Sequence, residues 1–259
     1  MDLAEIFDGL SAVSIRTLAL AARRPRQLRH YVSYCLKRYD ELAGVGLPSR
    51  NPVLPSAGDT LILPAVHTGG GMTFTETVIL ARVTKTRKPH TIFEMGSYDG
   101  LTTAIFILNA PNDARIYSLD LPPQSAATLP HLDTDRDLVS ARTIGAVPRA
   151  IGLNHYTQLF CDTMQFDPTP FLDSIDLGLV DAAHDAVHVR NDTLKMIRMM
   201  SPDGMVLWHD YGGKGAMRPL AAYLESIART CPLYRIPETT LAWAFAGDLK
   251  QASLEPVAA

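Results

Sequence analysis

The stretch Thr91-Ile-Phe-Glu-Met-Gly-Ser-Tyr-Asp-Gly-Leu-Thr-Thr103 decides how this chain folds. An apolar run ends in an acid, two glycines follow and a helical pattern begins, so we expect a strand, a tight turn and a helix. Gly96 and Gly100 let the backbone approach a ligand at the helix N-terminus, as a small-molecule site on a parallel sheet requires. Similar turns occur in α/β folds that bind nothing there, so the rest of the chain must decide.

The composition is that of an ordinary globular protein, with 259 residues, 47% of them hydrophobic and 20% charged, and a net charge of -3. This weak acidity argues against a nucleic-acid binder, because phosphate contacts call for a basic surface. Cys35, Cys161 and Cys231 form no CxxC pair, so neither a disulfide framework nor a zinc site is indicated and a reducing cytoplasm is expected. No apolar run approaches the roughly 20 residues that span a bilayer, so we expect no transmembrane segment.

Residues 1–64 are expected to form an N-terminal helical extension and a connector. Between Gly9 and Tyr39 there is no acid but there are seven basic side chains, and the apolar spacing predicts two short helices broken near Pro25. One interpretation is that this basic segment docks on an anionic substrate, a membrane surface or a second subunit. The other is a helical extension whose charges simply face water. We expect a homodimer or higher homo-oligomer through these helices.

Strands and helices alternate through the rest of the chain, which predicts an α/β protein with a doubly wound, mostly parallel sheet. A first helix begins near Thr73, which forms a capping box with Glu76. The last two strands are too close together for a crossover and should be antiparallel. Strands are expected at 91–94, 114–120, 157–162, 176–181, 205–210, 233–236 and 241–245, a turn at 201–204, and helices at 131–142, 186–200 and 216–229.

Nearly every expected strand ends in an acid or a histidine. In a doubly wound sheet these ends line the ligand crevice. Any single acid could be a helix N-cap, but agreement across five strands indicates a shared site. Asp120 follows Gly100 by twenty residues, the position that holds ribose hydroxyls in a βαβ unit. The converging side chains are Glu94, Asp120, Asp162, Asp181, His209 and Asp210.

From Met72 to Phe245 the chain resembles the class I S-adenosylmethionine-dependent methyltransferases. Residues 94–100 are similar to their first motif, and Asp120 to the acid after their second strand. Asp181-Ala-Ala-His184 and His209-Asp-Tyr211 are similar to the Asp-Gly-Ser-His and His-Asp-Tyr motifs of a bacterial branch. The resemblance implies a Rossmann-like seven-stranded sheet of order 3-2-1-4-5-7-6 with the last strand antiparallel, a methyltransferase domain at 65–250 and a tail at 251–259.

The same resemblance implies S-adenosylmethionine as cofactor and S-adenosylhomocysteine as product. Glu94 and Gly96 would border the methionine part, Asp120 would hold the ribose, and Leu121 with the turn at 162–164 would flank the adenine. Cys161-Asp-Thr163 departs from the family's more frequent Gly-Asp-Ser. The implied cofactor-binding residues are Glu94, Gly96, Ser97, Gly100, Asp120, Leu121, Asp162, Thr163 and Asp181.

Methyl transfer is an in-line displacement that needs an aligned acceptor and a base. We assign His184 as the base, because histidine titrates near neutral pH, and Asp181 and His209 complete the expected catalytic set. The region also resembles catechol O-methyltransferases, which implies metal ligands at Asp181, His209 and Asp210 for Mg²⁺, Mn²⁺ or Ca²⁺. Alternatively, His209 and Asp210 hydrogen-bond each other without a metal, and the sequence leaves both alternatives open.

These features favour a methyltransferase that acts on a small molecule, with a hydroxyl oxygen of a natural product or sugar as the expected acceptor. A nicotinamide oxidoreductase is disfavoured, since Gly96 and Gly100 give G-x-x-x-G rather than G-x-G-x-x-G. The other alternative is a non-catalytic S-adenosylmethionine-binding protein that dimerises through its basic helices.

Overall fold

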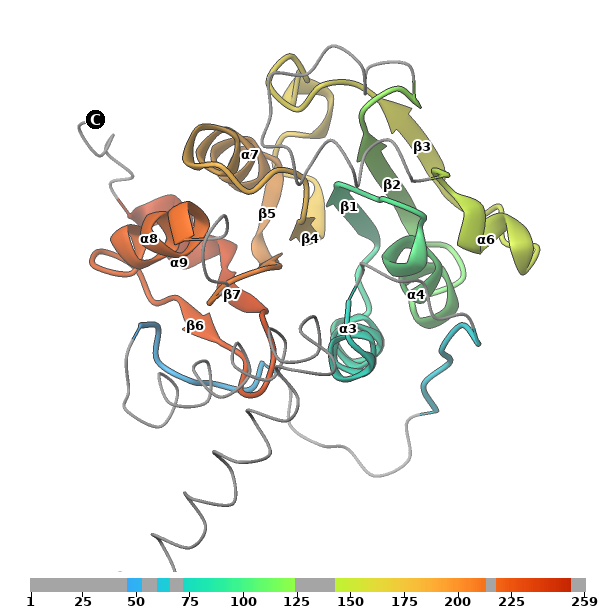
Figure 1. Cartoon of the computed structure of the whole chain (residues 1–259), viewed down its shortest axis with the longest axis horizontal. Helices are drawn as coiled ribbons and strands as arrows, with labels where there is room; N and C mark the ends of the chain where they lie inside the picture. Colours follow the sequence, from blue (N-terminus) through green and yellow to red (C-terminus); the bar gives the residue numbers. More distant parts are fainter. Residues whose placement is uncertain (1–45, 53–59, 66–71, 124–142, 213–217, 253–259) are drawn as a thin grey trace, which may run out of the picture. The chain divides into compact units, whose positions relative to one another are not determined.

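A computed structural model describes residues 46–52, 60–65, 72–123, 143–212 and 218–252, all of which belong to one compact unit, residues 46–259 (Figure 1). The helices expected between residues 9 and 39 and at 131–142 lie outside the described residues, so the domain limits stay predictions. Among the residues that the structure describes, no helix has both the length and the hydrophobicity needed to cross a membrane.

Seven strands form one sheet in the order β3-β2-β1-β4-β5-β7-β6, which confirms the expected order. The pairs β1–β2, β1–β4, β2–β3 and β4–β5 are parallel, whereas β7 runs antiparallel to both β5 and β6. The closing pair is therefore antiparallel, as its short connection predicts. The strands are β1 (Thr91–Met95), β2 (Arg115–Asp120), β3 (Thr157–Phe160), β4 (Ile175–Val180), β5 (Met200–Trp208), β6 (Tyr234–Arg235) and β7 (Ala242–Phe245).

Helices cover both faces of this sheet (Figure 1). The buried side chains of α3 and α4 belong to one core cluster and those of α7, α8 and α9 to another. The helices are α3 (Phe74–Arg87), α4 (Leu101–Asn109), α6 (Ala146–Ala150), α7 (Ala186–Met199), α8 (Arg218–Ile227) and α9 (Ala246–Gln251), with a short 3-10 helix, η2 (Thr169–Phe171).

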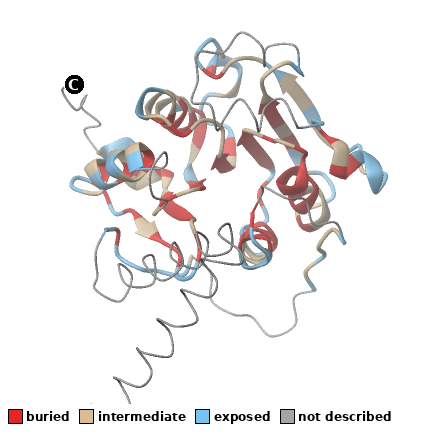
Figure 2. Cartoon of the chain, in the orientation of Figure 1, coloured by how far each residue is buried: buried red, intermediate tan, exposed pale blue. Residues whose placement is uncertain are grey.

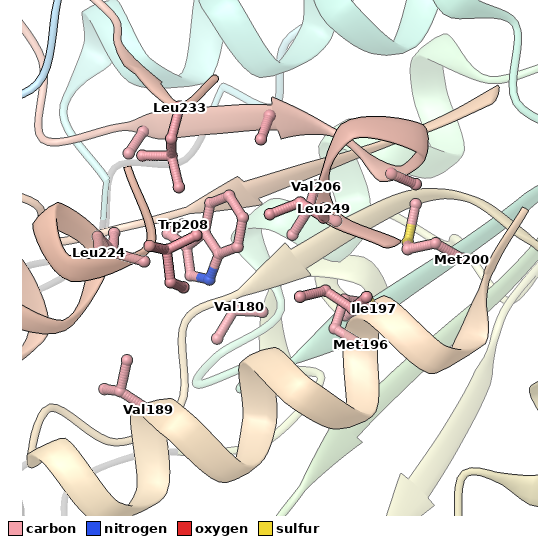
Figure 3. Packing of buried hydrophobic residues seen from close by; sticks show 14 of the residues in the cluster. Val180, Val189, Met196, Ile197, Met200, Val206, Trp208, Leu224, Leu233 and Leu249 are labelled. Atoms are coloured by element: carbon pink, nitrogen blue, oxygen red, sulfur yellow. The ribbon is translucent and has the colours of Figure 1, made fainter. Parts of the chain in front are cut away.

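The two cores follow from the side-chain alternation of the strands. In β1, Phe93 and Met95 belong to the α7 side, whereas Ile92 belongs to the α3 side. Buried residues accordingly dominate the central strands in Figure 2. On the α7 side, Trp208 is fully buried in the cluster drawn in Figure 3, and its indole N–H donates to Thr193 Oγ1 at 3.0 Å. The sheet is thus a rigid support for the side chains at the ends of its strands.

Two local expectations differ from the structure. The expected turn at 201–204 lies inside β5, where the pairing shifts from Ile175 opposite Met200 to Leu177 opposite Met205, so the extra residues form a bulge. Helix α9 was not expected. It forms because Ala246 and Leu249 are buried in the α7-side core, a contact that the local pattern does not encode.

Candidate active site

The turn between β1 and α4 is built from left-handed backbone conformations, as its glycines predict. Gly96 has φ +89° and Gly100 φ +87°, with Tyr98 at φ +51° between them. A Cβ atom at Gly96 would lie 2.0 Å from the carbonyl oxygen of Asp181, and one at Gly100 would lie 2.7 Å from Pro148 Cδ. Only glycine fits at these two positions, and the strand, turn and helix expected at 91–103 are confirmed.

Asp120 holds this turn from the end of β2. Its Oδ2 atom accepts from the backbone N–H of Ser97 at 3.1 Å, the hydroxyl of Ser97 at 3.1 Å and the N–H of Tyr98 at 2.9 Å. Its Oδ1 atom accepts from Leu121 N–H at 2.7 Å. Asp120, Ser97 and Leu121 therefore meet at one place, as expected for one side of a nucleoside site, while the contact to a ribose stays a prediction.

Glu94 lies beneath the turn rather than at its surface. The side chain is fully buried and accepts hydrogen bonds from the hydroxyls of Thr102, of Thr103 at 2.5 Å and of Ser118 at 2.8 Å. Burial raises the pKa of Glu94 to about 7, although the hydroxyl donors act in the opposite direction. Glu94 thus fastens β1 to the first turn of α4, and the predicted contact with the methionine part of a cofactor stays a prediction.

The loop after β3, expected to flank an adenine, is held by α7. Asp162 Oδ1 accepts from Met164 N–H at 2.9 Å, which shapes the loop. The carbonyl oxygen of Thr163 accepts from Asn191 Nδ2 at 3.0 Å and from Lys195 Nζ at 2.6 Å. Asn191 and Lys195 were not among the predicted site residues. Their spacing of four on one helix was the signal, because such residues share a helix face.

The ends of β4 and β5 bring the predicted catalytic residues together. Asp181 Oδ1 lies 3.1 Å from His209 Nδ1, and His184 Nε2 lies 2.9 Å from Asp210 Oδ2. Asp210 has φ +64°, a left-handed conformation uncommon for residues other than glycine and one that recurs at functional sites. All four predicted side chains therefore form one cluster.

Glu76 of α3 joins this cluster, and the sequence analysis recognised it only as part of a capping box. That box is present, with Thr73 as the N-cap. Glu76 Oε2 also lies 3.5 Å from His209 Nε2, and Oε1 accepts from the N–H and hydroxyl of Thr240 at 2.6 Å each. No sequence signal links α3 to a histidine more than a hundred residues away.

The cluster alternates between carboxylates and imidazoles, and burial acts on all of them. Burial raises the pKa of Asp181. It opposes ionisation of Asp210 and Glu76, but contacts with His209, joined by His184 at Asp210 and by Thr240 at Glu76, together lower the pKa of both carboxyl groups. Burial likewise disfavours the His209 imidazolium, yet Asp181 and Asp210 raise the pKa of His209 well above its ordinary value. The surrounding acids therefore favour the protonated form of His209.

One group of three side chains has the geometry to hold a divalent ion. The ligand atoms of Asp181, His184 and Asp210 all lie within 4.8 Å of one another. Two carboxylates and one imidazole are a reasonable donor set for such an ion. The expected set had His209 in place of His184. Both ring nitrogens of His209 face carboxylate oxygens, and the expected ligand set with His209 stays a prediction.

Comparisons with known proteins agree with this architecture. Residues 93–211 match a family model described as a methyltransferase domain. No curated protein matches the chain. Similar solved structures include a methyltransferase of Podospora anserina bound to S-adenosylhomocysteine, with 16% identity over 66% of this chain and 77% of that one and a TM-score of 0.48.

Two further similar structures are O-methyltransferases. TomG of Streptomyces achromogenes, in complex with S-adenosylmethionine, has 14% identity over 68% of this chain and 81% of that one, with a TM-score of 0.47. An enzyme of Bacillus cereus, in complex with S-adenosylhomocysteine, has 12% identity over 69% and 84%, with a TM-score of 0.49. By the matched segment and the strand order, residues 93–211 lie in a methyltransferase domain with the class I fold.

Proposed function

We propose that this chain is an O-methyltransferase that transfers the methyl group of S-adenosylmethionine to a hydroxyl of a small molecule, with His184 as the base. The observation that carries the proposal is the 2.9 Å contact between His184 Nε2 and Asp210 Oδ2, next to the glycine turn. A carboxylate in hydrogen-bond contact with one ring nitrogen orients the imidazole and favours the proton that it gains, the usual arrangement for a general base. An acceptor hydroxyl of a natural product or sugar fits this chemistry.

The cofactor side of the proposal is supported by the turn and its acids. The left-handed backbone at Gly96 and Gly100 allows a ligand to approach closely, and Asp120 ends β2, the position at which an acid would bind ribose hydroxyls in this kind of fold. The acidic residues around Asp181 suit a ligand that carries a positive sulfonium. When bound, this cofactor supplies an electrophilic methyl group. His184 would take the acceptor's proton as the oxygen–methyl bond forms and the sulfur–methyl bond breaks, which leaves S-adenosylhomocysteine.

A metal-assisted variant is the second candidate, because Asp181, His184 and Asp210 form a compact donor set. A divalent ion held there would act as a Lewis acid on the acceptor oxygen. A metal on His184 Nε2 would replace the contact with Asp210 that orients the ring as a base. Treatment with EDTA separates them: turnover that survives EDTA supports His184 as the base, and turnover restored only by Mg²⁺ or Mn²⁺ supports the metal.

Calorimetry with S-adenosylhomocysteine and with NAD tests the cofactor. We expect S-adenosylhomocysteine to bind and NAD not to bind, and the reverse result would contradict the proposed cofactor. Incubation with S-adenosylmethionine and a panel of hydroxylated small molecules then tests the reaction, with a product heavier by one methylene as the readout. A panel of amines run in parallel tests the oxygen, because methylation of amines alone would contradict O-methylation.

A further inference from the structure

Glu76 is buried more deeply than its place in a helix explains. A capping-box glutamate needs only to reach back to the N-cap, which can be done from the helix surface. Here the residue is 1% exposed, and Oε2 accepts from Thr73 N–H at 2.8 Å and from the Thr73 hydroxyl at 2.7 Å. Oε1 accepts two more hydrogen bonds from Thr240. Burying a carboxylate is costly unless a cation compensates for it, so the helix cap alone does not account for this position.

The neighbour of Glu76 on the other side of the site is His209. Glu76 Oε2 lies 3.5 Å from His209 Nε2, while His209 Nδ1 lies 3.1 Å from Asp181 Oδ1 and 3.4 Å from Asp210 Oδ2. Both ring nitrogens of His209 therefore face carboxylate oxygens. The His209 ring therefore lies between Glu76 of α3 on one side and the ends of β4 and β5 on the other.

The contacts continue from His209 to the proposed base. The Asp210 Oδ2 atom that faces His209 Nδ1 is also the atom that lies 2.9 Å from His184 Nε2. Glu76, His209, Asp210 and His184 thus form a continuous chain in which carboxylates and imidazoles alternate. A shift of the His209 ring would change how Asp210 is shared between the two histidines.

We infer that Glu76 is a positioning residue that fixes the His209 ring and, through Asp210, the orientation of His184. The inference rests on the proposed function only for the role given to His184. Glu76 also ties α3 to the loop before β7 through Thr240, so the same carboxylate joins three segments at the edge of the site. The role of Glu76 in the site is to orient His209, which in turn contacts Asp181 and Asp210.

The test is an NMR measurement of the ring nitrogen signals in the full-length protein labelled with ¹⁵N-histidine. The His209 signals are assigned by their loss in His209→Gln, and the His184 signals by their loss in His184→Gln.

Glu76→Gln is the informative variant, because glutamine also serves in a capping box but carries no charge. We expect the ring nitrogen signals of both His209 and His184 to shift relative to the wild type, because the uncharged glutamine no longer holds the His209 ring as the carboxylate does. Thr73→Ala is the matched control: it removes the cap hydroxyl and leaves the Glu76 carboxylate. It should lower the melting temperature and leave the His209 signals in place.

Unchanged His209 and His184 signals in Glu76→Gln would refute the inference, as would the same spectral change in Thr73→Ala, since the effect would then come from the helix cap. None of these measurements needs a methyl donor or acceptor. Failure to bind S-adenosylhomocysteine would therefore count against the proposed function alone, and the NMR result would still decide the role of Glu76.

Discussion

A Cβ atom at Gly96 would lie 2.0 Å from the carbonyl oxygen of Asp181. The turn after β1 and the end of β4 therefore touch backbone to backbone, with Asp181 N–H also donating to Met95 O at 2.8 Å. This contact places the expected cofactor turn beside the catalytic cluster. It leaves no room for a side chain between them.

Gly96→Ala should destabilise the protein by roughly 2–5 kcal/mol, because alanine disfavours φ +89° and its methyl group would overlap Asp181. Gly152→Ala is the matched control, since Gly152 has φ +73° but nothing within 4 Å of an added Cβ. It should cost only roughly 1–2 kcal/mol. Urea denaturation measures both. Equal losses in the two variants would show that the overlap with Asp181 does not matter.

His184→Gln should lower turnover on an acceptor that the wild type methylates by roughly 10²–10⁴-fold, the usual contribution of a general base. Asp210→Asn should lower it less, since the imidazole remains but loses its carboxylate partner. His188→Gln is the control, because His188 contacts Asp185 at 2.7 Å, outside the cluster. Steady-state kinetics, with S-adenosylhomocysteine affinity measured alongside, separate catalysis from binding. A His184→Gln variant with wild-type turnover would remove His184 as the base.

Glu94 should make stability depend on pH. Burial raises the pKa of Glu94 from its ordinary value of 4.5 to about 7. The folded protein then holds the proton more tightly than the unfolded chain, so the stabilisation is complete below pH 4.5 and is lost as the pH rises through about 7. Glu94→Gln lacks this titration. The free energy of unfolding of the wild type, relative to Glu94→Gln, should fall by roughly 3 kcal/mol across that window. A pH-independent difference in urea denaturation would contradict the expectation.

Lys195→Met should weaken binding of S-adenosylhomocysteine roughly fivefold, because the variant loses both hydrogen bonds by which Lys195 orders the loop after β3. Lys195 Nζ donates to the carbonyl oxygens of Thr163 at 2.6 Å and of Met164 at 2.9 Å. Lys250→Met is the control, because Lys250 Nζ donates to Met200 O at 2.6 Å, outside this loop. Calorimetry should show a lower affinity in Lys195→Met only. An equal change in both variants would mean that the loop is not part of the cofactor site.

Local sequence predicted the elements well where neighbouring residues decide them. The turn around Gly96 and Gly100 follows from backbone conformations that only glycine adopts easily, and the start of α3 follows from the Thr73 capping box. The bulge in β5 was missed, because a strand that continues across residues 201–204 depends on its partner β4. Helix α9 was also not predicted, because it depends on the burial of Ala246 and Leu249 in the α7-side core.

The sequence predicted which residues belong to the candidate site, but not how their side chains are arranged. Parallel strands bring their carboxyl ends to one edge, which is why Asp181, His184, His209 and Asp210 were expected together and are found together. Which histidine lies with Asp181 and Asp210 in a compact donor set could not be predicted from the sequence. That choice depends on the loop after β4 and on the left-handed backbone at Asp210, neither of which follows a periodic pattern.

The sequence by itself determined the strand order, through its alternation of elements and its resemblance to a known family, and the identity of the acids at the strand ends. The tertiary structure alone decided the neighbours of those acids. Glu76 and Thr240 are 164 positions apart, yet one carboxylate joins them beside His209. Such contacts form only when a buried charge finds its partner across the folded core, and no pattern confined to a few neighbouring residues carries that information.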